Sequence, residues 1–383
     1  LKCSVIKATN ILFTLMKFQI DQAVLLEGLL QVQSVVSSRA TLPILFNVLI
    51  ESDGDSALKL TTSNLETGMV VRVEAKVLEP GQTTLPARRL ASVVKELSAR
   101  EIEISIDDKN AATLKSGKSL FKLVGLSSAD FPPLTELKGE KQFSISQELL
   151  KKSLRKTSYA ISSDATRYVL HGIFTSFKDS KMTMVATDGR RLAMVAEDLD
   201  FPQANEVDII IPAKTITELS KVLSDEGEVL VKIDESSISF ELENATLVSK
   251  LISGNYPNYK QVIPGEARHR VTLDRKSFLE TLRRVTTVSD KTNNVTLNFE
   301  SGQLQVVAHA AEVGEAEETV EVDYTGDTLA ISFNAEYIVS VLEHLVEEQV
   351  YLDLIDGLTP GVIRLDSAFL YVLMPIRPVA PQN

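Results

Sequence analysis

The chain has 383 residues, of which 44% are hydrophobic, and only 13 are Pro and 17 Gly, so it can bury several cores and has little chain for long flexible linkers. Its formal net charge of −12 argues against a protein that holds nucleic acid by bulk electrostatic attraction, although it does not exclude DNA as a partner. The sequence has no run of 18 apolar residues, so no membrane-spanning helix is predicted.

Residues 1–15 are interpreted as an N-terminal extension, because "MKFQI" from Met16 has the pattern of a strand. The extension carries two lysines and a short apolar patch, but no small-residue cleavage site follows, so no signal peptide is predicted. The only cysteine, Cys3, lies in it, so the folded body is expected to use neither disulfides nor cysteine chemistry. A reducing cytoplasm fits this composition.

A strand that leads into a helix occurs three times along the chain. The three copies are "FQIDQAVLLEGLLQVQSVV" from Phe18, "FSISQELLKKSLRKTSYAI" from Phe143 and "HRVTLDRKSFLETLRRVTTV" from His269. Each copy continues into segments with the alternation of strands. Such self-similarity indicates a repeated structural unit.

A second unit also recurs three times, as a strand, a small polar break, a helix and an alternating strand. The copies begin at Thr83, Ile209 and Leu329, with Pro86, Pro212 and Asn334 in the same place. Their spacing is the length of a domain rather than of a short solenoid repeat. We therefore predict three domains, at residues 16–138, 139–266 and 267–383.

Each predicted domain holds two helices and about eight short strands, which is the pattern of an α+β unit with its helices on one side of antiparallel sheet. Three such units in tandem are expected to form a curved array. If each turns by a constant angle, the array closes into a ring or continues as a spiral.

Several motifs, taken in order, resemble those of the bacterial DNA polymerase III beta subunits, the sliding clamps. They are "MKF", "RATLPIL", "TLPARRL", "ADFPPL", "RYVLHGI", "VATDGRRLAMV", "YPNYKQVIP" and "YVLMPIRP", and they extend from Met16 to Pro378. The resemblance implies three repeats of the DNA-clamp fold, and a head-to-tail homodimer that forms a six-domain ring around duplex DNA without sequence specificity. It also implies a processivity factor with no catalysis, cofactor or metal, which binds the replicative polymerase, the clamp loader and other proteins that carry a clamp-binding motif.

The resemblance assigns DNA contact to Arg39, Arg88, Asp164, Arg167, Tyr168 and Val169. Long arginine side chains at a loop and a helix start can reach backbone phosphates, which positions DNA without reading its sequence. Asp164 and Val169 stand where the family often has an amide and a second aromatic residue. Basic residues also crowd the helical segments 148–156 and 274–284, where the alternative is an ordinary solvated face.

The second predicted domain contains "VATDGRRLAMV", in which two apolar strand-like segments flank an Asp-Gly turn that is followed by two arginines. Alone, those arginines could serve catalysis, phosphate binding or solubility. The resemblance instead assigns them to an outer cleft for short linear peptides, which we call the peptide cleft. Its predicted residues are Leu170, Thr187, Gly189, Arg190, Arg191, Leu192, Pro257, Gln261, Val262, Tyr337, Leu358, Val372, Met374, Pro375, Ile376 and Arg377.

Apolar residues with a polar rim, and an adaptable methionine, suit a groove that takes peptides from several partners. The alternative is that the aliphatic members belong to the core and the turn is merely solvated, and for the aliphatic residues alone this alternative is the stronger. Gln261 stands where a basic residue is common in the family.

The resemblance assigns the dimer contact to Phe121 and Leu123 of one copy and to Thr287 and Val288 of the other. Sheet edges with apolar ends need covering, so continuation of the sheet across subunits is reasonable. The acidic run 312–323 is predicted to be an exposed face that repels DNA, and a metal site is the weaker alternative because no ligand spacing accompanies it.

Enzyme interpretations find little support in the sequence. "ATLKSGKS" from Ala112 lacks the first glycine of a phosphate-binding loop and lies between predicted strands, so it is interpreted as a hairpin turn. The four histidines have no zinc-ligand spacing, and no nucleophile motif occurs. A tandem-repeat scaffold for proteins, without a DNA role, remains the second hypothesis.

Overall fold

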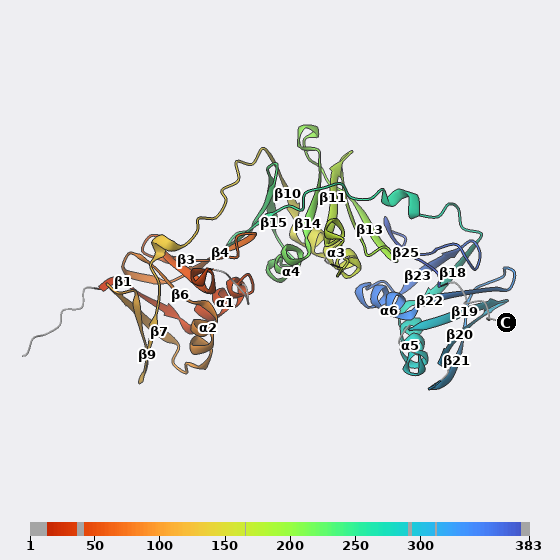
Figure 1. Ribbon diagram of the computed structural model, residues 1–383, viewed down its shortest axis with the longest axis horizontal. Helices are drawn as coiled ribbons and strands as arrows, with labels where there is room; N and C mark the ends of the chain where they lie inside the picture. Colours follow the sequence, from red (N-terminus) through yellow and green to blue (C-terminus); the bar gives the residue numbers. More distant parts are fainter. Residues whose placement is uncertain (1–13, 37–41, 165, 290–292, 311, 377–383) are drawn as a thin grey trace, which may run out of the picture. The chain divides into compact units, whose positions relative to one another are not determined.

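The computed structural model describes residues 14–36, 42–164, 166–289, 293–310 and 312–376 (Figure 1). Two helices lie in each of three successive repeats of the described chain. They are α1 (Gln22–Gln33), α2 (Ala87–Glu96), α3 (Gln147–Thr157), α4 (Ala213–Val222), α5 (Arg275–Val285) and α6 (Ala335–His344). None of the described helices is long and apolar enough to cross a membrane.

The strands are short and all of their pairings are antiparallel where a register is given. The first repeat has β1 (Thr14–Asp21), β2 (Asn47–Ser52), β3 (Ala57–Ser63), β4 (Thr67–Glu74), β5 (Lys76–Glu79), β6 (Gln82–Pro86), β7 (Glu101–Asp107), β8 (Ala111–Ser116) and β9 (Ser119–Val124). The second has β10 (Lys141–Ser146), β11 (Gly172–Lys178), β12 (Lys181–Thr187), β13 (Arg191–Asp198), β14 (Val207–Pro212), β15 (Glu228–Ile233), β16 (Ser237–Glu241) and β17 (Ala245–Lys250). The third has β18 (His269–Asp274), β19 (Asn294–Glu300), β20 (Gln303–Ala310), β21 (Gly314–Glu321), β22 (Leu329–Asn334), β23 (Gln349–Leu354), β24 (Gly361–Arg364) and β25 (Phe369–Leu373).

The strand-to-helix entries follow from local capping chemistry. Asp21 accepts a hydrogen bond from the N–H of Ala23, and Asp274 accepts one from the N–H of Ser277, at 2.9 and 2.7 Å. Each carboxylate satisfies a backbone donor that the first turn leaves unpaired. The helices that follow bury one apolar face: in α2, Leu90 and Val94 are fully buried. The α+β class predicted from the sequence is confirmed.

The chain divides into two compact units. One comprises residues 1–144, 217–223 and 228–250, and the other comprises 145–216, 224–227 and 251–383. Two sheets belong to the first unit, with strand orders β5-β1-β7-β8-β9 and β10-β15-β16-β17-β4-β3-β2-β6. The second unit has β14-β11-β12-β13-β25-β24-β23-β18 and β21-β20-β19-β22.

Each eight-stranded sheet joins strands of two successive repeats. In the first unit β17 of the second repeat pairs with β4 of the first, and in the second unit β25 of the third repeat pairs with β13 of the second. The strands β9 and β21 end their sheets. The predicted turn in "ATLKSGKS" is confirmed, because Gly117 joins β8 to β9 with φ of +56°, a conformation that suits glycine.

Candidate functional site

The turn between β12 and β13 is held by its own side chains. The Thr187 hydroxyl accepts from the N–H of Gly189 at 3.0 Å and donates to the carbonyl of Arg191 at 2.6 Å. The Asp188 carboxylate accepts the N–H groups of Arg190 and Arg191 at 2.9 and 3.0 Å. Gly189 has φ of +86°, which an L side chain rarely adopts. Thr187 and Asp188 therefore fix the conformation of this turn.

Arg191 points into the protein rather than into solvent. Its Nε lies 3.0 Å from the Asp188 carboxylate, its Nη2 donates to the Tyr159 carbonyl at 2.7 Å, and its guanidinium lies 4.5 Å from the ring centre of Tyr337. Only 14% of its side chain is exposed. Arg191 thus joins the turn to α6, with Tyr337 as its partner on that helix.

Tyr159, whose carbonyl accepts from Arg191, is half-buried and its hydroxyl is fully buried. The Tyr159 ring lies 5.7 Å from that of Tyr371 and 4.5 Å from that of His344. Burial raises the pKa of Tyr159 well above its ordinary value, so its hydroxyl stays neutral. The Tyr371 hydroxyl donates to the Tyr337 carbonyl at 3.0 Å, which ties β25 to α6.

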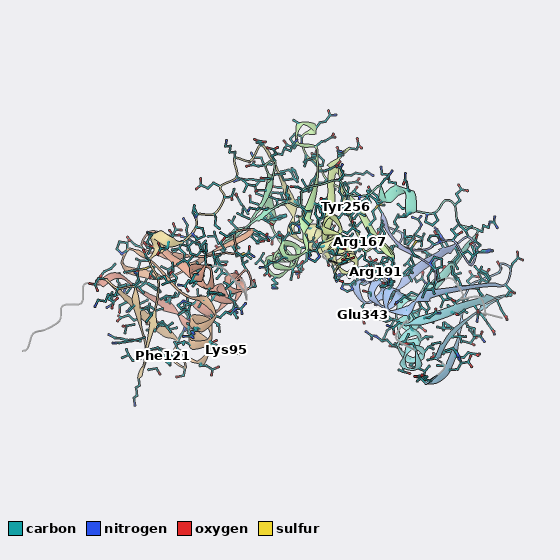
Figure 2. The ribbon with its side chains drawn as sticks, viewed as in Figure 1. Lys95, Phe121, Arg167, Arg191, Tyr256 and Glu343 are labelled. Atoms are coloured by element: carbon teal, nitrogen blue, oxygen red, sulfur yellow. The ribbon has the colours of Figure 1, made fainter. Side chains whose placement is uncertain are left out.

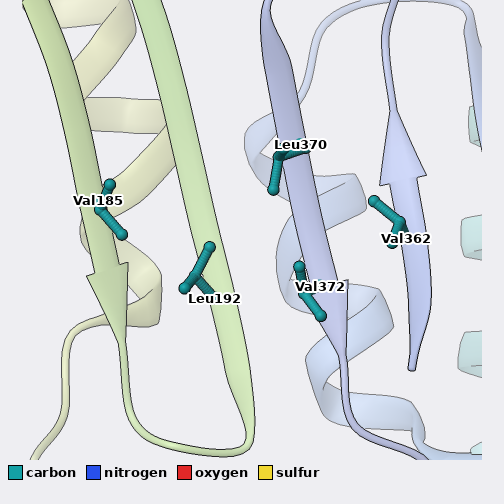
Figure 3. Packing of buried hydrophobic residues seen from close by; sticks show 5 residues of the cluster. All are labelled: Val185, Leu192, Val362, Leu370 and Val372. Carbon is teal, nitrogen blue, oxygen red and sulfur yellow. The ribbon is translucent and has the colours of Figure 1, made fainter. Parts of the chain in front are cut away.

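The aliphatic residues below the turn form one buried cluster. Figure 3 shows Val185 of β12, Leu192 of β13, Val362 of β24, and Leu370 and Val372 of β25 packed together. Leu192 and Val372 are 2% and 1% exposed. Leu192 and Val372, which were assigned to the peptide cleft, are therefore buried core residues, as the alternative from the sequence expected for the aliphatic members.

Three other apolar residues predicted for the peptide cleft are exposed. Val262 is 46% exposed, Met374 is 43% and Leu358 is 66%. The N–H of Met374 donates to the Arg190 carbonyl at 3.0 Å, so the C-terminal segment is fixed beside the turn. The N–H of Ile376 donates to the Ser332 carbonyl at 2.8 Å. Arg377 lies outside the described residues.

The linker that follows β17 packs on the same cluster. Tyr256 stacks on Phe174 with ring centres 5.2 Å apart, and Tyr259 lies 5.9 Å from the Phe174 ring. Burial raises the pKa of Tyr256, whose hydroxyl reaches the Val185 carbonyl at 3.4 Å. Pro257 and Gln261 of this linker are exposed, while Leu170 is buried at 7%.

The residues assigned to DNA are brought together only in part. Arg167 is exposed, lies 3.6 Å from Asp164 and donates to the Asp188 carbonyl at 3.3 Å, next to the turn of the peptide cleft (Figure 2). The Thr166 hydroxyl and N–H lower the pKa of Asp164. Tyr168 is 59% exposed and Val169 is half-buried.

Arg88 lies apart from this group in sequence, in the first turn of α2. It is exposed, and its Nη2 donates to the Val36 carbonyl at 3.1 Å, which directs the guanidinium toward the end of α1. Arg39 lies outside the described residues.

The basic residues of the helical segments 148–156 and 274–284 are exposed or half-buried, as expected from the sequence, with the exception of Lys156. Lys156 of α3 is 8% exposed and lies 3.0 Å from Glu347. Arg283 of α5 lies 2.6 Å from Glu343 of α6. These charges are paired inside the chain, because neighbouring elements supply carboxylates that the sequence of one helix cannot reveal.

The residues assigned to the dimer contact lie on or near exposed sheet edges. Phe121, labelled in Figure 2, is 39% exposed on β9, and Leu120 and Val124 of the same strand are 57% and 76% exposed. Thr287 is exposed in the short helical turn after α5. The acidic run coincides with β21, whose residues are exposed or half-buried along its whole length.

Three sequence profiles of one family match successive parts of the chain between residues 16 and 377. They describe the N-terminal, central and C-terminal domains of the DNA polymerase III beta subunit, over residues 16–135, 144–258 and 260–377. The chain belongs to the DNA polymerase III beta subunit family. The predicted family and the three-domain clamp fold are thereby confirmed.

Curated relatives in the beta subunit family carry the name beta sliding clamp. The protein of Chlamydia muridarum is 34% identical over 94% of this chain and 99% of its own length, and that of Pseudomonas aeruginosa is 36% identical over 94% and 100%. A crystal structure of the P. aeruginosa sliding clamp bound to griselimycin has a TM-score of 0.90 at 35% identity, covering 95% of this chain and 100% of that one. The Bacillus subtilis sliding clamp has a TM-score of 0.90 at 28% identity, with the same coverage.

The function is that of the beta subunit family: a sliding clamp, the non-catalytic processivity factor of DNA polymerase III in DNA replication. Three residues that shape the surface of the candidate site were not predicted from the sequence: Tyr159, Asp188 and Tyr256. Asp188 had a usable signal, because an Asp before Gly in a turn commonly accepts the next backbone N–H groups. Tyr159 had none, because its role depends on partners distant in sequence.

Proposed function

We propose that two copies of this chain close head to tail into a ring around duplex DNA, with β9 of each copy pairing with β21 of the other. The observation that carries the proposal is the repeated sheet junction. The last strand of the second repeat, β17, pairs with β4, and the last strand of the third, β25, pairs with β13. The equivalent strands β9 and β21 each lie at the edge of a sheet, where only β8 and β20 respectively pair with them among the described residues.

The register of the two internal junctions predicts the register between copies. One position is equivalent in the last strand of each repeat, because it pairs with the same position of the preceding strand. The pairs are Phe121 with Leu114, Leu247 with Phe240, and Tyr371 with Ile363. Leu247 lies opposite Met69 and Tyr371 lies opposite Ala193. Carried to β21, this rule puts Phe121 opposite the partner's Ala316 and Lys122 opposite the partner's Glu315.

The charges of the two edges are complementary. β9 and the turn before it carry the exposed Lys118 and Lys122, while β21 carries exposed or half-buried glutamates along its length. Opposite charges on facing strands stabilise pairing, and like charges discourage two identical edges from joining. The acidic edge thus favours head-to-tail pairing of β9 with β21 over the symmetric pairing of two β9 edges or of two β21 edges.

The contact with DNA is proposed for Arg39, Arg88, Arg167 and Tyr168, with Asp164 and Val169 beside the last two. Arg88 donates to one backbone carbonyl, and Arg167 donates to one backbone carbonyl and lies 3.6 Å from Asp164. Both guanidiniums are exposed, so their remaining donors can meet phosphate oxygens. Such contacts are weak and independent of base sequence, which suits a ring that moves along DNA.

The peptide cleft is proposed as the docking site of the replicative polymerase catalytic subunit, the clamp loader and other proteins with a clamp-binding motif. The exposed Val262, Leu358 and Met374 above the buried cluster provide apolar surface for a short peptide. We expect griselimycin, which the P. aeruginosa clamp binds, to bind this chain as well. As part of this proposal, the ring acts in the bacterial cytoplasm and its domains are residues 16–138, 139–266 and 267–383.

Sedimentation equilibrium tests the ring directly. The wild-type chain is expected to be a dimer at micromolar concentration, and Leu120→Asp with Val124→Asp on β9 is expected to yield a folded monomer. Leu78→Asp on β5, the other edge of the same sheet, is the matched control and should stay dimeric. A monomeric wild-type chain at that concentration contradicts the proposal.

A further inference from the structure

The linkers after the first and second repeats begin alike and then take different courses. "FPPLTEL" from Phe131 and "YPNYKQV" from Tyr256 each follow the last strand of a repeat and start with an aromatic residue and a proline. The second forms a short helical turn, Tyr259–Val262, and lies on Phe174. The first has no helix or strand.

The register of the sheets identifies which strand positions correspond. Three neighbouring strands carry the partners Leu49, Thr61 and Val70 in the first repeat, and Phe174, Val185 and Met194 in the second. Gly68 lies two residues before Val70, and Leu192 lies two residues before Met194. Their partners across the junction are Val248 and Val372. Gly68 is therefore the counterpart of Leu192, the floor of the peptide cleft.

Leu134 of the first linker covers Gly68. A Cβ atom on Gly68 would collide with Cδ2 of Leu134 and would lie 3.2 Å from its Cδ1. The side chain that Leu192 supplies from the strand in one repeat is thus replaced, in the other, by a side chain of the linker. This exchange of a large strand residue for glycine makes room for the linker on the sheet.

The linker occupies the counterpart of the peptide cleft. A cavity of about 70 Å³ remains there, lined by Pro133, Leu134, Ser63, Thr67, Val248 and Lys250. In the second unit, the counterparts of Ser63, Thr67 and Val248 are Thr187, Arg191 and Val372. All three are residues of the peptide cleft. The first linker also lines a larger cavity, of about 630 Å³, with Leu49 and Val70. The second linker lines a cavity of about 460 Å³ with Phe174, the counterpart of Leu49.

Both ends of the first linker are fastened. Phe131 is buried against Ile44 and Leu45. At the other end the Asp234 carboxylate accepts three successive N–H groups, from Lys138, Gly139 and Glu140, at 2.9, 3.0 and 3.2 Å. Pro132 and Pro133 restrict the backbone between these anchors to extended conformations. Leu134 is thereby held over Gly68 without any element of secondary structure.

We propose that Leu134 is a built-in occupant of a second groove, the counterpart of the peptide cleft at β4 and β17, and that the linker restricts each copy to one open peptide site. This inference rests on the proposed peptide cleft. When the linker is released, the groove takes the same class of ligand, a short apolar peptide, on Gly68, Val248 and the Ser63 hydroxyl. The tether keeps it closed because an attached segment competes at a high effective concentration.

Pro133→Ser with Leu134→Ser, in the full-length chain, releases the linker without touching the peptide cleft. The probe is a synthetic peptide copied from the clamp-binding segment of the cognate polymerase catalytic subunit, titrated by calorimetry. We expect one site per copy for the wild type and two for the variant, with the new site at least tenfold weaker. Met374→Asp added to the variant should leave only the new site.

Hydrogen exchange of residues 134–137 accompanies the titration. Faster exchange in the variant with a stoichiometry that stays at one overturns the inference, and so does unchanged exchange, because Leu134 would then not hold the linker. A wild-type stoichiometry of zero instead refutes the peptide cleft itself, so the two failures are distinguishable.

A second measurement does not depend on any peptide. Gly68→Leu should lower the melting temperature because the new side chain collides with Leu134. Adding Leu134→Ala should recover most of that loss, since the leucine on the strand then fills the vacated space. Additive losses for the two changes would contradict the assignment of Leu134 as the occupant.

Discussion

The pairing of Lys122 with the partner's Glu315 is the sharpest consequence of the proposed ring, because it follows from the register of two junctions inside the chain. Lys122→Glu would place like charges opposite each other at both interfaces of the ring. An opposite-charge pair on facing strands contributes roughly 0.2–1 kcal/mol, and a like-charge pair costs a similar amount. The reversal therefore costs about 0.4–2 kcal/mol per interface.

A ring has two such interfaces, so the dimer loses roughly 1–4 kcal/mol, with a central value near 2 kcal/mol. At 1.4 kcal/mol per tenfold change, the central value weakens the dimer about 30-fold. Sedimentation at low salt measures this change, and a smaller effect is expected at high salt because exposed charges are screened.

The decisive comparison is the double variant Lys122→Glu with Glu315→Lys, which restores the opposite charges in the reverse order. We expect it to recover most of the lost affinity. Lys76→Glu, an exposed residue on β5 at the other edge of the sheet, is the matched control and should leave the dimer unchanged. If the double variant dimerises no better than the single ones, the proposed register is wrong.

Three further predictions concern the second unit. Arg191→Met removes the contacts with Asp188, Tyr159 and Tyr337, so it should lower the free energy of unfolding by about 2–4 kcal/mol in denaturant titration. Arg190 is exposed, and Arg190→Met should change that free energy by about 0.5 kcal/mol or less. Equal losses for the two variants would contradict the inward role of Arg191. Partial burial pushes the pKa of Glu347 up, but the N–H groups of Glu347 and Val346 and the Lys156 ammonium outweigh it and hold that pKa below its ordinary value of 4.5. A lowered folded-state pKa contributes stability above pH 4.5 that disappears as the pH falls through the folded pKa, so Glu347→Gln should lose less stability than wild type between pH 5 and 3, and identical acid unfolding curves would refute this. Met374→Asp should weaken binding of a polymerase-derived peptide at least tenfold in a fluorescence anisotropy titration, while Leu78→Asp, an exposed apolar control on β5, leaves it unchanged; undiminished affinity would remove Met374 from the peptide cleft.

Local patterns predicted the repeated elements well. The three strand-to-helix entries end in residues that cap a helix, and Asp21 and Asp274 do so through their carboxylates. The hairpin at Gly117 followed from a glycine between two alternating segments. These features depend on residues close in sequence, which is why periodicity and turn chemistry suffice to predict them.

The orientation of two charged side chains could not be predicted from the sequence. Arg191 was expected at the rim, and the structure shows its guanidinium stacked on Tyr337 and bonded to the Tyr159 carbonyl. Lys156 was expected on an exposed basic face, and it is buried beside Glu347. Both differences arise from partners far along the chain, whose positions depend on the sheet pairing of the second and third repeats.

The covering of Gly68 by Leu134 was likewise invisible in the sequence. A glycine in an alternating strand indicates a close approach by another segment, but it does not say which segment approaches. The sheet register equates Gly68 with Leu192, and it therefore places Leu134 at the position that corresponds to the proposed peptide cleft in the other unit.

The most direct test of the central claim is topological. The purified chain, loaded onto nicked circular DNA by its clamp loader, is separated from free protein by gel filtration before and after a restriction enzyme linearises the circle. A closed ring is expected to stay with the circle and to slide off once the DNA has ends. Retention that is the same on circular and linear DNA, or no retention on either, would contradict the account.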